Sequence, residues 1–184
     1  MRVSRPSLEG LVVFEPPMYR DARGVFRETY RADAYSAESL PQTFVQHNVS
    51  TSAKHVLRGL HSQYPVAQGK LVYVLEGEVY DVAVDARIGS STFGKWHAET
   101  LSCENGRQMY VPPGFLHGFV VLSERAIVAY LCSEYYAPSG QLSIRWNDPD
   151  IGIPWPVAQP ILSEKDRVAP CLREIPVDYL VHLS

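Results

Sequence analysis

Short runs of β-branched and aromatic residues recur along the chain, separated by turn-forming residues. Runs of this kind are typical of β-strands, whereas amphipathic helices repeat their apolar residues every three or four positions. We therefore predict strands at 11–14, 44–50, 55–61, 70–75, 78–84, 108–111, 118–122 and 126–132. Turn signals such as Pro112-Pro113-Gly114 and Pro138-Ser139-Gly140 lie between them, as antiparallel sandwiches or barrels require.

Helices are expected to be few and short. One is predicted at 31–40, and a single turn is predicted at 163–167, where Ser163 is a suitable N-cap. No internal repeat or flexible linker interrupts the pattern. The sequence thus predicts one mainly β domain that spans residues 1–184.

Both faces of the expected strand at 77–85 are partly apolar. Side chains alternate across a strand, so one face carries Tyr80, Val82 and Val84 and the other carries Val79 and Ala83. We expect one face to line a barrel core and the other to pack against a neighbouring sheet or subunit, as in jelly rolls. A homodimer is the expected assembly.

Composition narrows the class of protein further. Hydrophobic residues make up 46% of the chain and charged residues 20%, with a formal net charge of -3, which favours neither nucleic acid nor an anionic membrane as partner. The sequence contains neither an apolar leader nor a run of about 20 apolar residues, so a cytoplasmic location is expected. The three cysteines lack CxxC spacing and are expected to be reduced.

A cluster of polar residues stands on an apolar background at 56–70. It contains Arg58, His61, Gln63 and Lys70 among valines, leucines and glycines, which is hard to accommodate as core alone. Strict alternation separates Arg58 from His61, but a bulge at Gly59 could bring them together. Two further candidates are His117, after the turn at 112–114, and Tyr130, inside an apolar strand. Either could instead be a structural residue whose polar atom is hydrogen-bonded within the fold.

Ten motifs in one order carry a family resemblance. They are DARGVFRE (21–28), FVQHN (44–48), VLRGLH (56–61), QGKLV (68–72), GEVYDVAVDAR (77–87), STFGKW (91–96), PPGFLHGF (112–119), WNDP (146–149), IGIPWP (151–156) and LSEKD (162–166). With them the chain resembles the dTDP-4-dehydrorhamnose 3,5-epimerases nearly from end to end. The resemblance implies a cupin-type jelly-roll barrel, a homodimer, no cofactor, and a dTDP-4-keto-6-deoxy sugar bound inside the barrel.

The resemblance also implies residue roles. His61 matches the general base, Asp166 the carboxylate that orients it, Tyr130 the proton donor on the opposite face of the sugar, and Lys70 the cation near the developing oxyanion. Such chemistry suits these groups, because a C4 ketone acidifies the C3 and C5 hydrogens but needs a base and a stabilised enolate. Further ligand contacts are implied at Arg23, Phe26, Glu28, Gln46, His47, Asn48, Arg58, Gln63, His117, Gln141 and Lys165, with Tyr136 stacked on the thymine.

Two departures from the family pattern leave alternatives open. His47 and Gln141 stand where the family commonly has Asp and Glu, which removes negative charge near the expected ligand. The alternatives are a C3-only epimerase, an enzyme for another nucleotide keto-sugar, and a non-catalytic sugar-nucleotide-binding barrel. A metal-dependent cupin is disfavoured, because His61 and His117 each lack a second histidine two residues away.

Overall fold

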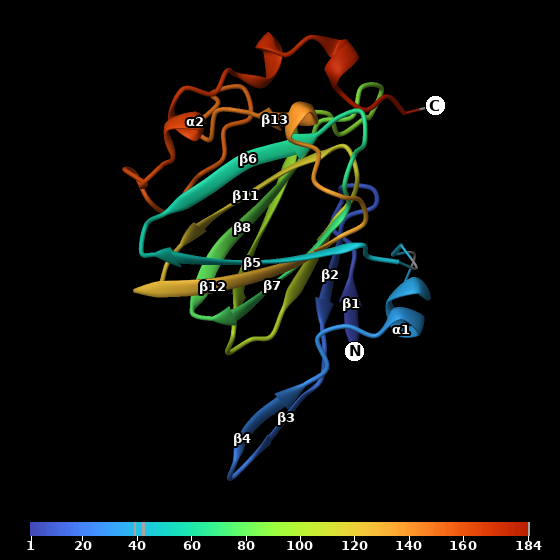
Figure 1. The fold of residues 1–184 in the computed structure, drawn as a ribbon, viewed down its shortest axis with the longest axis vertical. Helices are drawn as coiled ribbons and strands as arrows, with labels where there is room; N and C mark the ends of the chain where they lie inside the picture. Colours follow the sequence, from blue (N-terminus) through green and yellow to red (C-terminus); the bar gives the residue numbers. More distant parts are fainter. Residues whose placement is uncertain (39, 42, 184) are drawn as a thin grey trace.

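The computed structural model describes residues 1–38, 40–41 and 43–183, and it consists of two antiparallel sheets packed face to face (Figure 1). The six-stranded sheet has the order β1 (Arg2–Ser4), β2 (Val12–Glu15), β10 (Gln108–Val111), β7 (Lys70–Glu76), β12 (Arg125–Cys132) and β5 (Gln46–Ala53). The five-stranded sheet has the order β13 (Gln141–Ser143), β6 (Leu57–Gln63), β11 (Phe115–Val121), β8 (Glu78–Asp85) and β9 (Trp96–Ser102).

The remaining elements are small. Strands β3 (Met18–Asp21) and β4 (Gly24–Arg27) form a hairpin that projects from the body of the molecule (Figure 1). The helices are α1 (Ala32–Ser36) and α2 (Glu164–Arg167), with 3₁₀ turns at Pro138–Gly140, Leu172–Glu174 and Val177–Tyr179. None of the described helices is long and apolar enough to cross a membrane.

Most of the predicted elements are present. All eight predicted strands correspond to β-strands, with ends shifted by a few residues, and Ser163 caps α2 by accepting a hydrogen bond from the Asp166 amide. The helix predicted at 31–40 is shorter, and residue 39 of that range lies outside the described residues. The prediction omitted β1, β3, β4, β9 and β13. These strands are short or polar and lie at sheet edges or in the hairpin, where the burial that produces a periodic pattern is weak.

The main core lies between the two sheets. Val72, Val74 and Val128 from the six-stranded sheet pack with Ala83 and Phe119 from the five-stranded sheet, and all are at most 3% exposed. This apolar contact fixes the separation of the sheets, and burial of each valine or phenylalanine side chain stabilises the fold by about 1.5–3 kcal/mol.

The outer face of β8 is covered by the chain's own C-terminal part. Val82 and Val84 pack there against Ile151, Ile153 and Leu172. The sequence prediction that a neighbouring sheet or subunit covers this face is therefore wrong, because alternation shows that a face is buried but not what buries it. A second chain is not needed to explain the apolar residues of β8.

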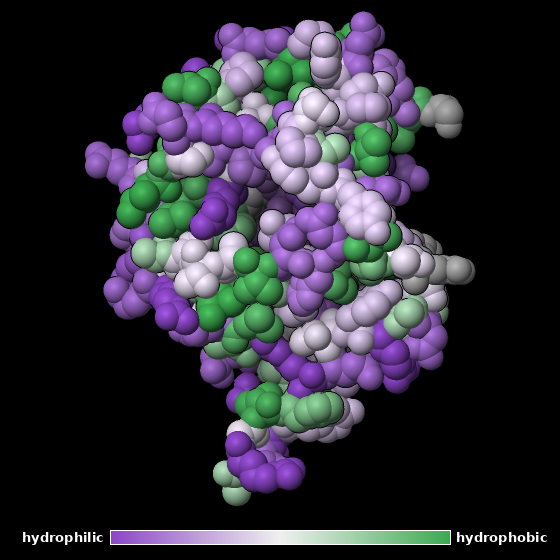
Figure 2. All heavy atoms as spheres, in the orientation of Figure 1, coloured by the Kyte–Doolittle hydropathy of each residue, from purple (hydrophilic) through white to green (hydrophobic). Residues whose placement is uncertain are grey.

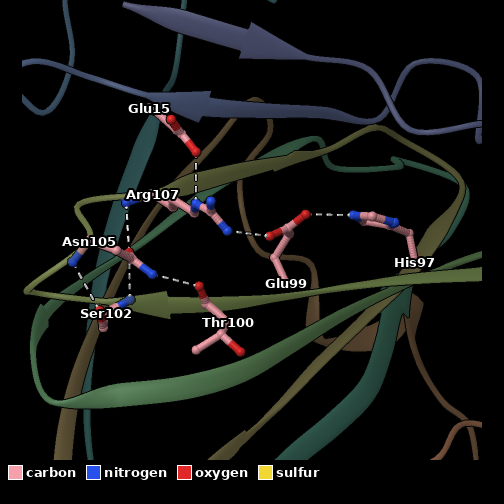
Figure 3. A network of polar contacts seen from close by, with 7 residues as sticks. All are labelled: Glu15, His97, Glu99, Thr100, Ser102, Asn105 and Arg107. Carbon is pink, nitrogen blue, oxygen red and sulfur yellow. Dashed lines mark hydrogen bonds and ion pairs between the residues drawn. The ribbon is translucent and has the colours of Figure 1, made fainter.

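A polar network joins the two sheets (Figure 3). Arg107 donates one hydrogen bond to Glu15 of β2 (2.9 Å) and another to Glu99 of β9 (3.3 Å), while His97 and Glu99 approach to 3.0 Å. The hydrogen bond with His97 is the main reason that the pKa of Glu99 lies below its ordinary value. The network thus connects the polar edge strand β9, which the sequence pattern did not predict, to the opposite sheet.

Candidate functional site

A cavity of about 440 Å³ opens between the sheets, and its walls carry the candidate catalytic residues. His61 comes from β6 of the five-stranded sheet, Tyr130 and Lys70 come from β12 and β7 of the six-stranded sheet, and Asp166 comes from α2. An adjoining pocket of about 340 Å³ shares His61, Lys70, Tyr130 and Gln141 with it. The two form one elongated cleft, and Figure 2 shows this face of the molecule hollowed near its centre.

A bulge in β6 places Arg58 and His61 on the same wall. In the pairing with β11, His61 lies opposite His117 and Arg58 lies opposite Phe119, so β6 has one residue more between these pairs. The extra residue is Gly59, whose φ of +134° suits glycine, and a Cβ there would meet the Gly118 Cα at 2.6 Å. The bulge anticipated from the sequence therefore exists, and it depends on two glycines in contact.

His61 is oriented by a short hydrogen bond. Its Nε2 lies 2.6 Å from Oδ1 of Asp166, a carboxylate that is 3% exposed and held at the N-terminus of α2 by the Ser163 cap. Burial alone would raise the pKa of Asp166, but the hydrogen bond and the charge of His61 hold it below its ordinary value. Asp166 is therefore a carboxylate near neutral pH, and Nε2–H of His61 donates to it. The other ring nitrogen is then free to accept a proton.

Tyr130 faces the cavity from the opposite sheet. On the inner face of that sheet, the ladder register places Tyr130 between Asn48 of β5 and Val72 of β7. Burial raises the pKa of Tyr130, and the nearby Arg58 charge and an Asn48 hydrogen bond oppose this shift only in part. The phenol therefore keeps its proton near neutral pH and can donate it.

Lys70 brings a cation into this apolar setting. The side chain is partly accessible from the cavity, yet burial lowers its pKa, and the nearby Cys132 and Asp81 raise it only in part. Within the part of the chain that the structure describes, no carboxylate lies within ion-pair distance of Lys70. Its ammonium group is thus available to an anionic or oxyanionic ligand.

A second histidine–carboxylate pair lies deeper in the same wall. Nε2 of His117 is 2.8 Å from Oδ1 of Asp81, which is fully buried and whose Oδ2 has no hydrogen-bond partner in the described part of the chain. The sequence analysis missed Asp81 as a site residue. The signal was present, because alternation puts this carboxylate on the same face as Val79 and Ala83, where a charge needs a partner.

Neutral polar groups line the other end of the cleft. The Tyr136 hydroxyl donates to Oε1 of Gln141 (2.7 Å), and the Tyr136 amide donates to Oε1 of Gln46 (2.9 Å). Asn48 and Gln63 belong to the same lining, whereas Arg58 and Lys165 line the end that contains His61. The cleft is therefore cationic at the His61 end and uncharged at the Tyr136 end. Among the described residues, no group of three or more His, Cys, Asp or Glu side chains could hold a metal ion.

A family model for dTDP-4-dehydrorhamnose 3,5-epimerase matches residues 5–174. The chain belongs to this family. It is 49% identical to the dTDP-4-dehydrorhamnose 3,5-epimerase of Methanothermobacter thermautotrophicus, with 96% of this chain and 97% of the relative covered. It is 52% identical to the enzyme of the same name from Pseudomonas aeruginosa, with 91% and 93% covered.

Solved structures agree with the sequence relatives. The dTDP-6-deoxy-D-glucose-3,5-epimerase of Legionella pneumophila, solved with dTDP-4-keto-L-rhamnose, is 46% identical, with a TM-score of 0.97 and with 100% of this chain and 98% of that chain covered. The 3'-monoepimerase of Streptomyces bikiniensis, solved with dTDP-quinovose, is 37% identical with a TM-score of 0.86, and 91% and 86% of the chains are covered. The predictions of family and of a mainly β, cupin-like jelly-roll fold are confirmed.

Four residues of the site implied by the family resemblance do not line the cleft in this chain. His47 points to the other face of β5 and lies 3.2 Å from the Tyr73 hydroxyl, because strand alternation turns it away from Gln46 and Asn48. The departure from the family pattern at His47 is therefore outside the cavity, whereas Gln141 lies in it. The other three, Arg23, Phe26 and Glu28, belong to the projecting hairpin or follow it.

The glycine contact in β6 can be tested with a matched pair of substitutions. Gly59 and Gly24 have similar φ values of +134° and +126°, but a Cβ at Gly24 meets nothing within 4 Å. We expect Gly24→Ala to cost about 1–2 kcal/mol of unfolding free energy through backbone strain alone. Gly59→Ala should cost at least about 2 kcal/mol more, because it also forces β6 away from β11. Urea denaturation measures both, and equal losses would contradict the close-contact argument.

Proposed function

We propose that this protein epimerises a dTDP-4-keto-6-deoxy sugar at C3 and C5 by removing a proton from one face of the ring and returning one to the other. The reaction belongs to deoxysugar biosynthesis of the dTDP-L-rhamnose type. The observation that carries the proposal is that His61 and Tyr130 line one cavity from opposite sheets. Inversion of a carbon needs a base and an acid on its two sides, and this arrangement supplies them.

His61 is proposed as the base. Its Nδ1, the ring nitrogen that does not face Asp166, is available to accept the proton. Asp166 fixes the ring orientation at 2.6 Å and, as a carboxylate, stabilises the imidazolium that forms when His61 takes the proton. The same base would also remove the proton at the second carbon, because C3 and C5 both lie next to the C4 carbonyl.

Lys70 and Tyr130 are proposed to complete the step. Removal of a proton next to the ketone moves negative charge onto the C4 oxygen, and the Lys70 ammonium stabilises this charge inside the cavity. The Tyr130 phenol, which stays protonated because its pKa is raised, then donates to the carbanion carbon from the face opposite His61. His117, held by Asp81, contacts the same region of the ligand.

The nucleotide serves as a handle in this proposal. Arg58 and Lys165 line the cavity and are suited to the diphosphate, since charged donors bind phosphate oxygens strongly. The uncharged amides and the Tyr136 ring at the other end suit a neutral pyrimidine, which an aromatic ring can stack on. Binding energy from these remote contacts holds C3 and C5 against the base.

We also propose a homodimer in which the hairpin of one subunit reaches the cleft of its partner. Phe26 is 69% exposed and Tyr19 is 62% exposed, and Figure 2 shows hydrophobic surface on the projecting hairpin. An exposed apolar arm of this kind favours contact with another surface. An exchange of arms would bring Arg23, Phe26 and Glu28 to a ligand that they do not approach in their own chain.

A C3-only reaction is the second candidate. The chain is also 36% identical to the dTDP-4-dehydrorhamnose 3-epimerase of Streptomyces niveus over 95% of its length. The two reactions share the base, the donor and the oxyanion site, and they differ in which carbon is presented to them. Proton exchange therefore separates them directly.

The exchange experiment uses dTDP-4-dehydro-6-deoxyglucose in heavy water, with deuterium located by NMR. We expect label at both C3 and C5, and label at C3 alone would select the second candidate. His61→Ala should abolish exchange at both carbons. Tyr130→Phe should retain exchange but lose inversion, because the base remains while the donor on the other face is gone. Tyr110→Phe, on the other face of the same sheet, is the control and should behave like the wild type.

The charge of Lys70 predicts the alkaline limb of the pH–rate profile. Because burial lowers the pKa of Lys70, its charge is present below that lowered pKa and is lost as pH rises through it. The rate should fall on this limb before Tyr130 ionises, since the pKa of Tyr130 is raised. Lys70→Met should lower kcat about 10²–10³-fold. The residual activity of Lys70→Arg should not show the alkaline fall in rate, because arginine stays charged. The control variant Lys165→Arg should keep the fall. An unchanged alkaline limb in Lys70→Arg would exclude the role of the Lys70 charge.

Arm exchange can be tested by mixing inactive subunits. His61→Ala lacks the base, and the double variant Arg23→Ala/Phe26→Ala lacks the arm contacts. Hybrids made by co-expression should regain activity, because one cleft combines an intact base with the partner's intact arm. The activity should approach about a quarter of the wild-type value for random pairing of a symmetric dimer. No recovery from verified hybrids would show that the arm acts only in its own subunit, or not at all.

A further inference from the structure

The inward face of β5 is polar along its whole length. Gln46, Asn48, Ser50 and Ser52 point toward the interior, while the residues between them are exposed. An edge strand that packs on a hydrophobic core normally turns apolar residues inward. The first three of these side chains line the cleft, so this row faces ligand space rather than core.

Three of the four side chains have partners in the protein. Gln46 donates to Oδ1 of Asn48 (3.0 Å), Asn48 donates to the Cys132 sulfur (3.7 Å), and Ser52 accepts from Nε of Arg58 (2.9 Å). Ser50 differs, because its Oγ is buried and has no hydrogen-bond partner among the residues that the structure describes.

The lack of a partner at Ser50 has a local cause. In the β5–β12 ladder Ser50 lies opposite Val128, and Val74 follows on the same face in β7, so its neighbours in the sheet offer no polar group. A buried hydroxyl without a partner is unfavourable and uncommon in folded proteins. Alanine at this position would avoid that cost, so a serine here calls for a partner from outside the chain.

The position of Ser50 indicates which part of a ligand supplies that partner. Ser50 lines the cavity that contains His61, Arg58 and Lys70, and it does not line the adjoining pocket that contains Tyr136. Along β5 it is one inward position from Asn48, which lies opposite Tyr130. A rotation of about 120° about its single side-chain torsion changes the direction in which Oγ points, so the hydroxyl can adjust to a ligand in the cavity.

We propose that Ser50 is a substrate-positioning residue whose hydroxyl forms its hydrogen bond with a hydroxyl group of the sugar ring. This inference rests on the proposed function, because it takes the ligand of the cavity to be a nucleotide sugar. A serine hydroxyl both donates and accepts, as a sugar hydroxyl does, so either orientation of the pair satisfies both groups. The bond holds the ring on the β5 side of the cavity, next to the phenol of Tyr130.

The matched variants are Ser50→Ala and Ser143→Ala. Both serines have a buried Oγ without a partner, but Ser143 lies on β13 and does not line the cleft. Each variant should unfold at a temperature equal to or above that of the wild type, because an unpaired buried hydroxyl is removed. Ser50→Ala should bind dTDP-glucose, which lacks the reactive ketone, roughly ten-fold more weakly. Its affinity for dTDP and both affinities of Ser143→Ala should be unchanged.

Calorimetric titration of dTDP and dTDP-glucose separates the outcomes. Wild-type affinity of Ser50→Ala for dTDP-glucose would overturn the role of Ser50 and leave the proposed function intact. Equal weakening of the affinities for dTDP and dTDP-glucose would assign Ser50 to nucleotide binding. A lowered unfolding temperature in Ser50→Ala but not in Ser143→Ala would assign it to the fold. Either result would also overturn the proposed contact with the sugar. If the wild-type protein bound neither ligand, the proposed function would fail and this inference with it.

Discussion

The close approach of two glycines, Gly59 and Gly118, determines the geometry of the cleft. Strand alternation would send Arg58 and His61 to opposite sides of β6, one into the cavity and one into the outer layer. The extra residue at Gly59 restores both to the inner wall, and it fits only because neither glycine has a Cβ at the contact. The orientation of His61 toward Asp166, and the path of Arg58 to Ser52, follow from this single local irregularity.

The ionisable groups of the cleft differ in how they are paired. Asp166 and Asp81 are buried beside His61 and His117, which fixes each ring by a hydrogen bond. Lys70 has no carboxylate partner at ion-pair distance among the described residues, so its ammonium group is available to an anionic ligand. The cavity thus combines two oriented imidazoles with the cationic side chains of Arg58, Lys70 and Lys165, a setting that favours negative charge on a ligand.

Sequence reasoning was most successful where burial imposes a period. The strands that cross the core, such as β7, β8 and β12, have continuous or alternating apolar patterns and were predicted nearly to the residue. Edge strand β9 has no such pattern, since only one side of it is paired and, apart from Trp96 and Leu101, its side chains are polar or small. The His61–Asp166 contact joins residues 105 positions apart, so no local pattern could reveal it, and it was expected only from the family resemblance.

Residues 144–180 cover the outer face of the five-stranded sheet, and they link the burial of that face to the position of Asp166. The same stretch that shields Val82 and Val84 from water also contains α2, and with it Asp166. Loosening of this stretch would expose apolar surface and leave the His61 ring without its anchor at the same time. Loosening of the whole stretch is therefore expected to weaken the burial of the outer sheet and the positioning of the proposed base together.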